Sequence, residues 1–345
     1  MELIKDRKIK FAVIGCGHIG KRHAEMITRN SNCELVAIVD IKPKEKLNIE
    51  QYSEIPFFSS INDFLNSEVE TDIISITTPN GYHAAYAIKC LEAKNHVVIE
   101  KPMALTKADA EEVIFKALNV SKQIFTVMQN RYSPPSVWIK DIVSNGTLGE
   151  IYSVHVNSFW NRDERYYTAD SWHGDKKLDG GTLFTQFSHF IDIMYWLFGD
   201  ITNIKATLKD FKHQNMTDFE DAGVVNFEFV NGGIGNFNFS TALYNQNMES
   251  SITIIAENGA VKIGGQYMNE VSYCHIKDYD MPELAPTNPG NDYGAYKGSA
   301  QNHHYVFENV VDVLKYGKAI KTNALEGMKI VDIIERIYES AKFTK

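Results

Sequence analysis

Short apolar runs alternate with helix-length amphipathic stretches through the first part of the chain. These runs are rich in β-branched residues and lie at 9–14 (IKFAVI), 34–39 (ELVAIV), 73–77 (IISIT), 96–99 (HVVI) and 124–127 (IFTV). Such runs are typical of strands that are buried on both faces of a parallel sheet. Residues 1–129 are therefore predicted to form a doubly wound α/β domain of the Rossmann type.

One of the intervening helices is predicted to begin after Thr106, because threonine is a good N-cap residue. The residues that follow place five apolar side chains along one helical face, namely Ala110, Val113, Ile114, Ala117 and Leu118. This spacing indicates an amphipathic helix.

After about residue 130 the pattern changes to alternation of apolar and polar residues. Val225, Phe227 and Phe229 point one way along one such run, and turn sequences occur at 231–233 (NGG) and 257–259 (ENG). Alternating strands joined by such turns are typical of antiparallel hairpins. The second half of the chain is therefore predicted to contain an open, mostly antiparallel sheet.

Helices are expected beside this sheet at 186–198, 303–316 and 325–342, where apolar residues recur at helical spacing. The fold class is thus α/β, with a Rossmann domain over 1–129 and an α+β domain over 130–345, whose last helix can pack back on the first domain. Segment 280–302 reads as a long loop, and long loops in compact domains are often functional.

Composition narrows the range of functions. The chain has 345 residues, of which 44% are apolar, and its 35 basic against 44 acidic residues leave a net charge of -9. This balance disfavours binding to nucleic acid or to an anionic membrane. The four cysteines lie far apart, so neither a zinc site nor a disulfide framework is expected. No apolar run reaches the roughly 18 residues of a membrane span, and a cytoplasmic protein is expected.

The segment Gly15-Cys16-Gly17-His18-Ile19-Gly20 follows the first strand directly and opens a helix. In this context the first glycine permits a tight turn, the second lets a pyrophosphate approach the backbone, and the third lets the helix pack on the strand. Asp40 ends the second strand, where a carboxylate binds ribose hydroxyls and repels a 2′-phosphate. The pattern predicts NAD rather than NADP, a preference that Lys42 and Lys44 temper.

Two further polar segments follow strands, namely Thr77-Thr78-Pro79-Asn80 and Glu100-Lys101-Pro102. Both are predicted at the carboxyl edge of the sheet, where open α/β folds bind ligands. Beside a nicotinamide, Lys101 can bond a substrate hydroxyl or, with its pKa lowered by burial, accept the proton. The alternative is a surface ion pair with Glu100. A cis Lys101–Pro102 bond is a further hypothesis.

Over nearly its whole length the chain resembles the Gfo/Idh/MocA oxidoreductases. The resemblance rests on AVIGCGHIGKRHAEMI, on ITTPNGYHAAYAIKCLEAKNHVVIEKPMALT, on WHGDKKLDGG at 172–181 and on the final helix. It implies a Rossmann domain, an open sheet for substrate binding and oligomer contacts, a nicotinamide cofactor and a sugar-like polyol. It also implies that Lys101 is the family's EKP lysine and that His189 is its histidine after the GG motif.

Many family members carry Asp-x-Gly-x-His in that helix, whereas here Thr185 and Phe187 replace the aspartate and the glycine. The carboxylate partner of the histidine is therefore missing from the motif. Together with QNRYSPPSVWIK at 129–140 and FWNRDERYY at 159–167, this variant is similar to the UDP-N-acetyl-D-glucosaminuronate 3-dehydrogenases. Those enzymes serve the biosynthesis of bacterial surface polysaccharides such as lipopolysaccharide.

The predicted site residues fall into three groups. The predicted catalytic pair is Lys101 and His189, and no metal ligands are predicted. Predicted cofactor contacts are Gly15, Cys16, Gly17, His18, Ile19, Gly20, Asp40, Ile41, Thr77, Thr78, Pro79, Asn80, His83, Glu100, Lys101, Gln129 and Trp172. Predicted substrate contacts are Lys101, Arg131, Tyr132, Asn161, Arg162, Tyr166, Gln186 and His189. A guanidinium suits a uronate carboxylate or a diphosphate, although each arginine is as readily an ordinary surface residue.

His189 is expected to be the general base, because a neutral imidazole titrates near the working pH. Lys101, kept charged by Glu100, is expected to donate a hydrogen bond that stabilises the developing alkoxide. The alternative assignment exchanges the two roles. Asp192, three residues after His189, can orient the ring, and a solvated or capping role is an equal interpretation.

The predicted function is NAD-dependent oxidation of the 3-hydroxyl of a UDP-linked N-acetylated sugar acid. Two alternatives stay open, namely a dehydrogenase of a free polyol or sugar and a noncatalytic NAD-binding regulator of the same fold. Retention of Lys101 and His189 favours an enzyme. The resemblance also implies a homodimer or homotetramer and, in the suggested subgroup, bound NADH that is reoxidised by 2-oxoglutarate.

Overall fold

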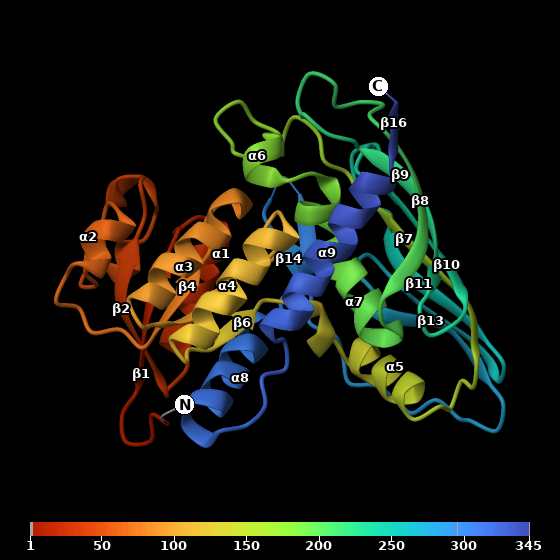
Figure 1. Cartoon of the computed structure of the whole chain (residues 1–345), viewed down its shortest axis with the longest axis horizontal. Helices are drawn as coiled ribbons and strands as arrows, with labels where there is room; N and C mark the ends of the chain where they lie inside the picture. Colours follow the sequence, from red (N-terminus) through yellow and green to blue (C-terminus); the bar gives the residue numbers. More distant parts are fainter. Residues whose placement is uncertain (1–2, 295, 345) are drawn as a thin grey trace. The chain divides into compact units, whose positions relative to one another are not determined.

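The computed structural model describes residues 3–294 and 296–344, and the chain divides into two compact units (Figure 1). Unit 1 comprises residues 1–128 and 303–331, and unit 2 comprises 129–302 and 332–345. The predicted division into 1–129 and 130–345 differs from this, because the chain returns to unit 1 after residue 302.

The returning segment contains α8 (His303–Tyr316) and the first part of α9 (Ala324–Ser340). The packing of α8 explains why the segment belongs to unit 1. The Phe307 ring lies 5.7 Å from the Phe11 ring and 5.0 Å from the His23 ring, measured between centroids. Phe307 is 1% exposed, so α8 covers part of the apolar core of unit 1.

Unit 1 is built on a six-stranded, all-parallel sheet, which confirms the predicted parallel sheet and adds one short strand, β3, to the five predicted runs. Its strands are β1 (Ile9–Ile14), β2 (Cys33–Val39), β3 (Phe57–Phe58), β4 (Ile73–Ile76), β5 (His96–Ile99) and β6 (Ile124–Thr126). The order is β3-β2-β1-β4-β5-β6, so the chain changes direction across the sheet between β1 and β4. Ligands of open α/β sheets bind at the carboxyl ends of the strands beside such a switch point.

The helices between these strands are α1 (His18–Arg29), α2 (Ile61–Leu65), α3 (His83–Glu92) and α4 (Lys107–Asn119), and α3 and α4 lie side by side (Figure 1). The predicted N-cap of α4 is confirmed, since the Thr106 hydroxyl accepts a hydrogen bond from the Asp109 amide at 3.1 Å. Leu118 is 73% exposed, so the prediction of Leu118 on the apolar face is wrong. The buried stripe of α4 is narrower, because Leu118 follows the buried Ala117 by one residue and is therefore turned about 100° away from it.

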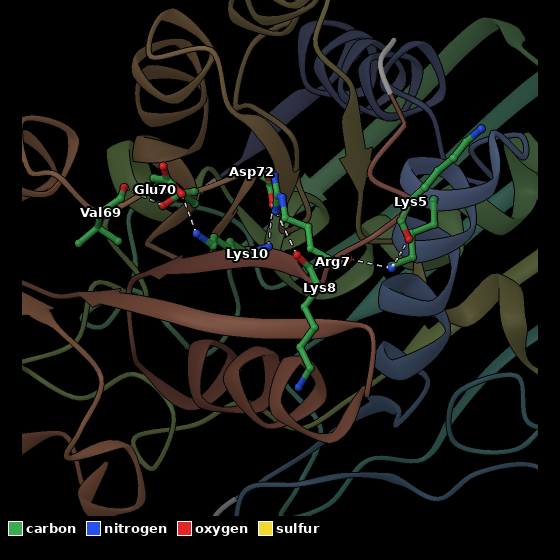
Figure 2. A network of polar contacts seen from close by, with 9 residues as sticks. Lys5, Arg7, Lys8, Lys10, Val69, Glu70 and Asp72 are labelled. Carbon is green, nitrogen blue, oxygen red and sulfur yellow. Dashed lines mark hydrogen bonds and ion pairs between the residues drawn. The ribbon is translucent and has the colours of Figure 1, made fainter.

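The segment before β1 is fixed by charged side chains (Figure 2). Arg7 binds both carboxylate oxygens of Asp72 at 2.6 Å, and Lys10 binds Glu70 at 2.7 Å. Burial acts to raise the pKa of Asp72, but the hydrogen bonds from Arg7 and from the Lys10 amide outweigh it and lower the pKa. These contacts tie the entry of β1 to the segment that leads into β4.

Unit 2 contains an eight-stranded sheet in the order β13-β12-β11-β7-β10-β9-β8-β16. Its strands are β7 (Ile151–Phe159), β8 (Ile201–Lys209), β9 (Ala222–Phe229), β10 (Ile234–Ser240), β11 (Glu249–Ala256), β12 (Gly259–Gly264), β13 (Glu270–Ile276) and β16 (Lys342–Thr344). Only the β7–β10 and β8–β16 pairs are parallel, which confirms the mostly antiparallel prediction. Both predicted hairpin turns are present, between β9 and β10 and between β11 and β12.

The helical elements of unit 2 include η4 (Gln129–Tyr132), α5 (Pro134–Ser144), α6 (Lys176–Asp179) and α7 (Ser188–Phe198). The helix predicted over 186–198 begins with a π-helical turn, η5 (Leu183–Phe187), before α7. The segment predicted as a loop at 280–302 contains a small hairpin, β14 (Gly290–Asp292) with β15 (Lys297–Ala300). Within the described residues, no helix combines the length and the apolar character that crossing a membrane requires.

Aromatic packing holds η5 and α7 on the sheet of unit 2. The Phe187 ring lies 6.2 Å from Phe237 and 5.7 Å from Phe239, and the Phe190 ring lies 5.6 Å from Trp160. All five rings are buried, and a fully buried phenylalanine contributes about 1.5–3 kcal/mol. This packing fixes the segment that carries Gln186 and His189.

Candidate functional site

The first βα turn contains three glycines, and at two of them a larger residue would clash with the backbone. Gly15 has φ +88°, and a Cβ there would lie 2.8 Å from the Thr77 carbonyl oxygen. A Cβ on Gly20 would lie 1.9 Å from the Gly15 carbonyl oxygen, whereas one on Gly17 would meet nothing within 4 Å. Gly17 is the N-cap of α1, and no side chain caps the helix there. The turn therefore fits a dinucleotide pyrophosphate.

The Asp40 side chain is hydrogen-bonded to this turn. Its carboxylate accepts hydrogen bonds from the backbone amides of Cys16 at 2.6 Å and Lys42 at 2.8 Å. Burial raises the pKa of the Cys16 thiol to about 11, so Cys16 stays neutral and serves the turn through its backbone. His18 is exposed, Ile19 is half-buried and Ile41 is 85% exposed.

The residues that follow β4 make hydrogen bonds to the end of β1 and to the glycine turn after it. The Thr77 hydroxyl donates to the carbonyls of Ile14 at 3.0 Å and Gly15 at 2.6 Å, which ties β4 to the glycine turn. Among the described residues, the buried Thr78 hydroxyl has no hydrogen-bond partner, so it is available to a ligand. Pro79 and Asn80 follow, and Asn80 is buried at the start of the next 3-10 turn.

His83 bridges two of these segments. Its Nδ1 lies 2.7 Å from the Pro102 carbonyl oxygen, and its Nε2 lies 2.8 Å from that of Thr78. Burial lowers the pKa of His83. The structure therefore shows His83 bridging two segments of the protein, and its predicted contact with the cofactor stays a prediction. The Lys101–Pro102 peptide bond is cis, which confirms that hypothesis.

Three buried side chains that sequence analysis did not connect meet behind Lys101. Glu100 Oε1 lies 3.0 Å from His23 Nε2 and 3.7 Å from His303 Nε2, and Glu100 Oε2 accepts a hydrogen bond from the Lys101 amide at 3.1 Å. The other His23 nitrogen lies 2.6 Å from the Ser75 hydroxyl. Two imidazoles and a carboxylate are also a ligand set for zinc. In the structure both carboxylate oxygens have close partners, and these contacts hold the Glu100 side chain in place.

Charge in this cluster is concentrated on Glu100. Burial acts to raise its pKa, but the hydrogen bond from His23 and the nearby charges of His23, His303 and Lys101 together outweigh burial and lower the pKa to about 2. Burial lowers the pKa of His303 to about 3. Near neutral pH the carboxylate is therefore ionised and His303 is neutral, which favours a charged Lys101 as the next residue.

In unit 2, His189 lies close to Gln129. The Nε2 atoms of the two side chains are 3.1 Å apart, and each residue is 3% exposed. Asp192, which was considered as an orienting group for His189, binds Arg131 through both carboxylate oxygens at 2.8 and 2.6 Å. Asp192 is 1% exposed, so a solvated role is excluded. Tyr132 follows Arg131 on η4.

Arg162 is the centre of a second cluster in unit 2. Its Nε donates to Gln186 Oε1 at 2.7 Å, and the Gln186 amide donates to the Tyr166 hydroxyl at 2.7 Å. The guanidinium lies 4.8 Å from the Trp160 ring centroid and 5.0 Å from that of Tyr296. Burial lowers the pKa of Arg162. Among the described residues no carboxylate binds this guanidinium, whose acceptors are neutral amide and carbonyl oxygens.

The remaining predicted residues have structural partners. Asn161 donates to the Leu243 carbonyl at 2.6 Å and accepts from Arg165 at 2.9 Å. Trp172 stacks on His173, with ring centroids 4.0 Å apart. Sequence analysis missed Asn247, whose Oδ1 lies 3.3 Å from an Arg162 nitrogen, because no spacing links such distant segments.

Two parts of the chain match known domain families. Residues 9–128 match the domain described as "Oxidoreductase family, NAD-binding Rossmann fold", and residues 137–262 match the "GFO/IDH/MocA C-terminal domain". The chain belongs to the Gfo/Idh/MocA oxidoreductase family. Membership confirms the predicted family, and the matched first domain confirms NAD as the cofactor. A dinucleotide-binding first domain explains both the open space at Gly17 and the parallel sheet of unit 1.

Two solved structures share about a third of this family member's sequence. The WlbA dehydrogenase from Bordetella pertussis, in complex with NADH and UDP-GlcNAcA, is 31% identical with a TM-score of 0.84, covering 97% of this chain and 96% of that one. WlbA from Chromobacterium violaceum, with the same ligands, is 31% identical with a TM-score of 0.85, covering 99% and 95%.

A curated relative points to another substrate class within the family. Inositol 2-dehydrogenase from Salmonella typhimurium is 27% identical over 230 residues. The aligned region spans 65% of this chain and 65% of that relative. The family therefore contains proteins that act on a free cyclitol as well as proteins crystallised with a nucleotide sugar.

Proposed function

We propose that this protein is an NAD-dependent dehydrogenase that oxidises the 3-hydroxyl of a UDP-linked N-acetylated sugar acid, UDP-N-acetylglucosaminuronate. The observation that carries the proposal is the environment of Arg162. Arg162 is 2% exposed, and no carboxylate of the described residues binds its guanidinium. An anionic substrate supplies the missing counter-charge, because guanidinium offers paired donors to a carboxylate or a diphosphate. A neutral polyol gives no reason to bury this cation.

The two WlbA structures support the same substrate class. They contain UDP-GlcNAcA, and their similarity to this chain extends over at least 97% of its residues. The similarity to inositol 2-dehydrogenase is lower in identity and covers 65% of the chain. We therefore give the nucleotide sugar acid priority over a free cyclitol.

The proposed roles place two side chains on one hydroxyl. The glycine turn and Asp40 would hold NAD, which would supply the hydride acceptor for this oxidation. His189 takes the hydroxyl proton as general base, and Lys101 donates a hydrogen bond to the oxygen as it becomes negative. Ionised Glu100, held by His23, favours the charged form of Lys101.

The exchanged assignment, with Lys101 as base, predicts a different pH profile. If His189 is the base, kcat/KM rises with an apparent pKa of roughly 6–7, and His189→Ala flattens this limb while NAD still binds. A limb that survives in His189→Ala and disappears in Lys101→Ala assigns the proton to Lys101.

Three wider features belong to the same proposal. We propose a homodimer or homotetramer, reoxidation of bound NADH by 2-oxoglutarate, and a place in the synthesis of a bacterial surface polysaccharide. They rest on the resemblance to the UDP-N-acetyl-D-glucosaminuronate 3-dehydrogenases. Light scattering of the purified protein measures the oligomer, and repeated turnover that requires added 2-oxoglutarate tests the reoxidation.

The deciding experiment is a substrate panel read out by NADH formation. It compares UDP-N-acetylglucosaminuronate, neutral UDP-N-acetylglucosamine, myo-inositol and free sugars, with Lys101→Ala as the inactive control. Turnover of the acid above all others is expected. Turnover of inositol or a free sugar alone selects the polyol dehydrogenase. NAD binding without turnover of any compound selects the noncatalytic regulator.

A further inference from the structure

Gln129 is placed to act on His189. It begins η4, it is 3% exposed, and its amide nitrogen lies 3.1 Å from Nε2 of His189, which is buried to the same degree. Among the described residues, the Gln129 carbonyl oxygen has no hydrogen-bond partner. One end of the amide therefore contacts the histidine, while its other end makes no competing hydrogen bond.

A buried ion pair next to this contact fixes its geometry. Arg131, two residues after Gln129, binds Asp192, three residues after His189, with two hydrogen bonds of 2.8 and 2.6 Å. The pair joins η4 to α7 and so holds Gln129 against His189. Its two opposite charges lie together, so the pair adds little net charge beside the imidazole.

The family motif has an aspartate at the position of Thr185. In this chain Thr185 is neutral, and its hydroxyl donates to the Asp179 carbonyl at 3.0 Å and to the Asp179 carboxylate. A carboxylate beside an imidazole stabilises the charged ring and raises its pKa. An amide can be turned so that its carbonyl accepts a hydrogen bond from Nε2–H of the ring, in the neutral and in the protonated state alike, and the proton from the substrate then goes to Nδ1.

We propose that Gln129 is a positioning residue that holds the His189 ring in both protonation states without adding charge, in place of the motif aspartate. This rests on the proposed function, in which His189 is the general base. It adds that a neutral side chain from η4 sets the orientation and basicity of that base. The ion pair of Arg131 on η4 and Asp192 on α7 joins the two elements that carry Gln129 and His189, and both charges remain in every variant below.

The test replaces Gln129 by the isosteric acid and by an apolar residue of similar length. In Gln129→Glu the new carboxylate should move the titration midpoint of His189 up by about one pH unit or more. Gln129→Met should not raise the midpoint. Nitrogen NMR of labelled histidine measures the midpoint in the whole protein, with His189→Gln to assign the signal. The pH profile of kcat/KM should shift in parallel. An unchanged midpoint in Gln129→Glu overturns the proposal.

Asn130→Asp is the matched control. Asn130 is also a buried amide of η4, and its amide nitrogen lies 3.4 Å from the Ser299 hydroxyl. A charge at this position should move the His189 midpoint less than Gln129→Glu does, and an equal shift contradicts a specific contact.

The NMR midpoint needs no turnover, so the two proposals fail separately. If the midpoint moves but no UDP-sugar acid is oxidised, the proposed function fails alone. If the acid is oxidised but Gln129→Glu leaves the midpoint unchanged, the role of Gln129 fails alone. Should Gln129→Glu not fold, a midpoint that rises in Gln129→Met also overturns the proposal. The amide carbonyl binds the protonated ring more strongly than the neutral ring, so its loss should lower the midpoint or leave it unchanged.

Discussion

Unit 2 buries two arginines in two different ways. Arg131 is 5% exposed and shares two hydrogen bonds with the carboxylate of Asp192, whereas Arg162 is 2% exposed and binds neutral oxygens among aromatic rings. A buried cation with its own counter-ion is complete as a structural element. A buried cation that lacks a counter-ion retains its charge for a ligand. Burial alone therefore does not distinguish a structural arginine from a ligand-binding arginine. The presence or absence of a counter-ion in the protein distinguishes them.

The largest expected effect comes from removing the counter-ion of Arg131. Asp192→Asn should lower the free energy of unfolding by about 3–5 kcal/mol, because breaking a buried ion pair leaves a desolvated charge poorly compensated. Urea denaturation followed by circular dichroism measures the loss. The double variant Arg131→Met/Asp192→Leu should recover most of it. A stable Asp192→Asn protein contradicts the structural role of the pair.

Glu220 is a buried acid of the same unit that pairs with no cation among the described residues. It is 2% exposed, it accepts a hydrogen bond from the Tyr338 hydroxyl at 2.7 Å, and burial raises its pKa from 4.5 to about 7. Between pH 4.5 and about 7, Glu220 is ionised in the unfolded chain but stays protonated in the folded protein. This group therefore stabilises the fold below pH 4.5, and its contribution is lost as the pH rises to about 7.

Glu220→Gln should abolish that dependence, which is worth about 3 kcal/mol over the window. The measurement is the difference in unfolding free energy between wild type and variant at several pH values, so that groups common to both cancel. A difference that does not change with pH contradicts the raised pKa.

Arg162 should instead affect binding. Arg162→Gln should raise KM for the UDP-sugar acid by roughly 10–100-fold, since a hydrogen bond to a charged group contributes about 1.5–3 kcal/mol. Its unfolding free energy should change less than that of Asp192→Asn. Neutral UDP-N-acetylglucosamine is the control: an arginine on the carboxylate matters for the acid only, and one on the diphosphate matters for both. Unchanged KM together with a large loss of stability makes Arg162 structural.

Asp40 in unit 1 is the acidic counterpart of Arg162, because neutral backbone amides satisfy its carboxylate. Asp40→Ser should narrow the preference for NAD over NADP by about 1 kcal/mol, roughly fivefold in relative affinity, since a repulsive charge is removed. Fluorescence titration with both cofactors measures this. Adding Lys42→Ala should reverse the gain in NADP affinity. Equal affinity of the wild type for both cofactors contradicts the role of Asp40.

The sequence predicted the local elements well, because each depends on residues close in the chain. The apolar runs of unit 1 became its buried strands, and Thr106 became an N-cap as its side chain required. Errors occur at helix edges. In α9 the predicted face holds for Val331, Ile334 and Ile337, whereas Leu325 is 61% exposed at the start of the helix. Helical spacing shows which face of a helix is apolar, whereas the tertiary fold determines how many residues of that face are buried.

Contacts between side chains that are far apart in the sequence were harder to predict. Sequence analysis named Arg162, Gln186 and Tyr166 as candidates, and the structure joins them by hydrogen bonds. It did not foresee that Asp192 binds Arg131, because two charges 61 positions apart carry no spacing signal. The π-helical turn was also missed, since its apolar residues suit an α-helix equally well.

The return of residues 303–331 to unit 1 has a consequence for synthesis on the ribosome. His303 of α8 contacts Glu100, and Phe307 covers Phe11, so the first unit lacks both until most of the chain has been translated. The nascent Rossmann sheet must therefore wait, with part of its apolar core uncovered, while the whole of segment 129–302 emerges. The cofactor-binding unit is completed among the last parts of the molecule, although its first strand is among the earliest to be made.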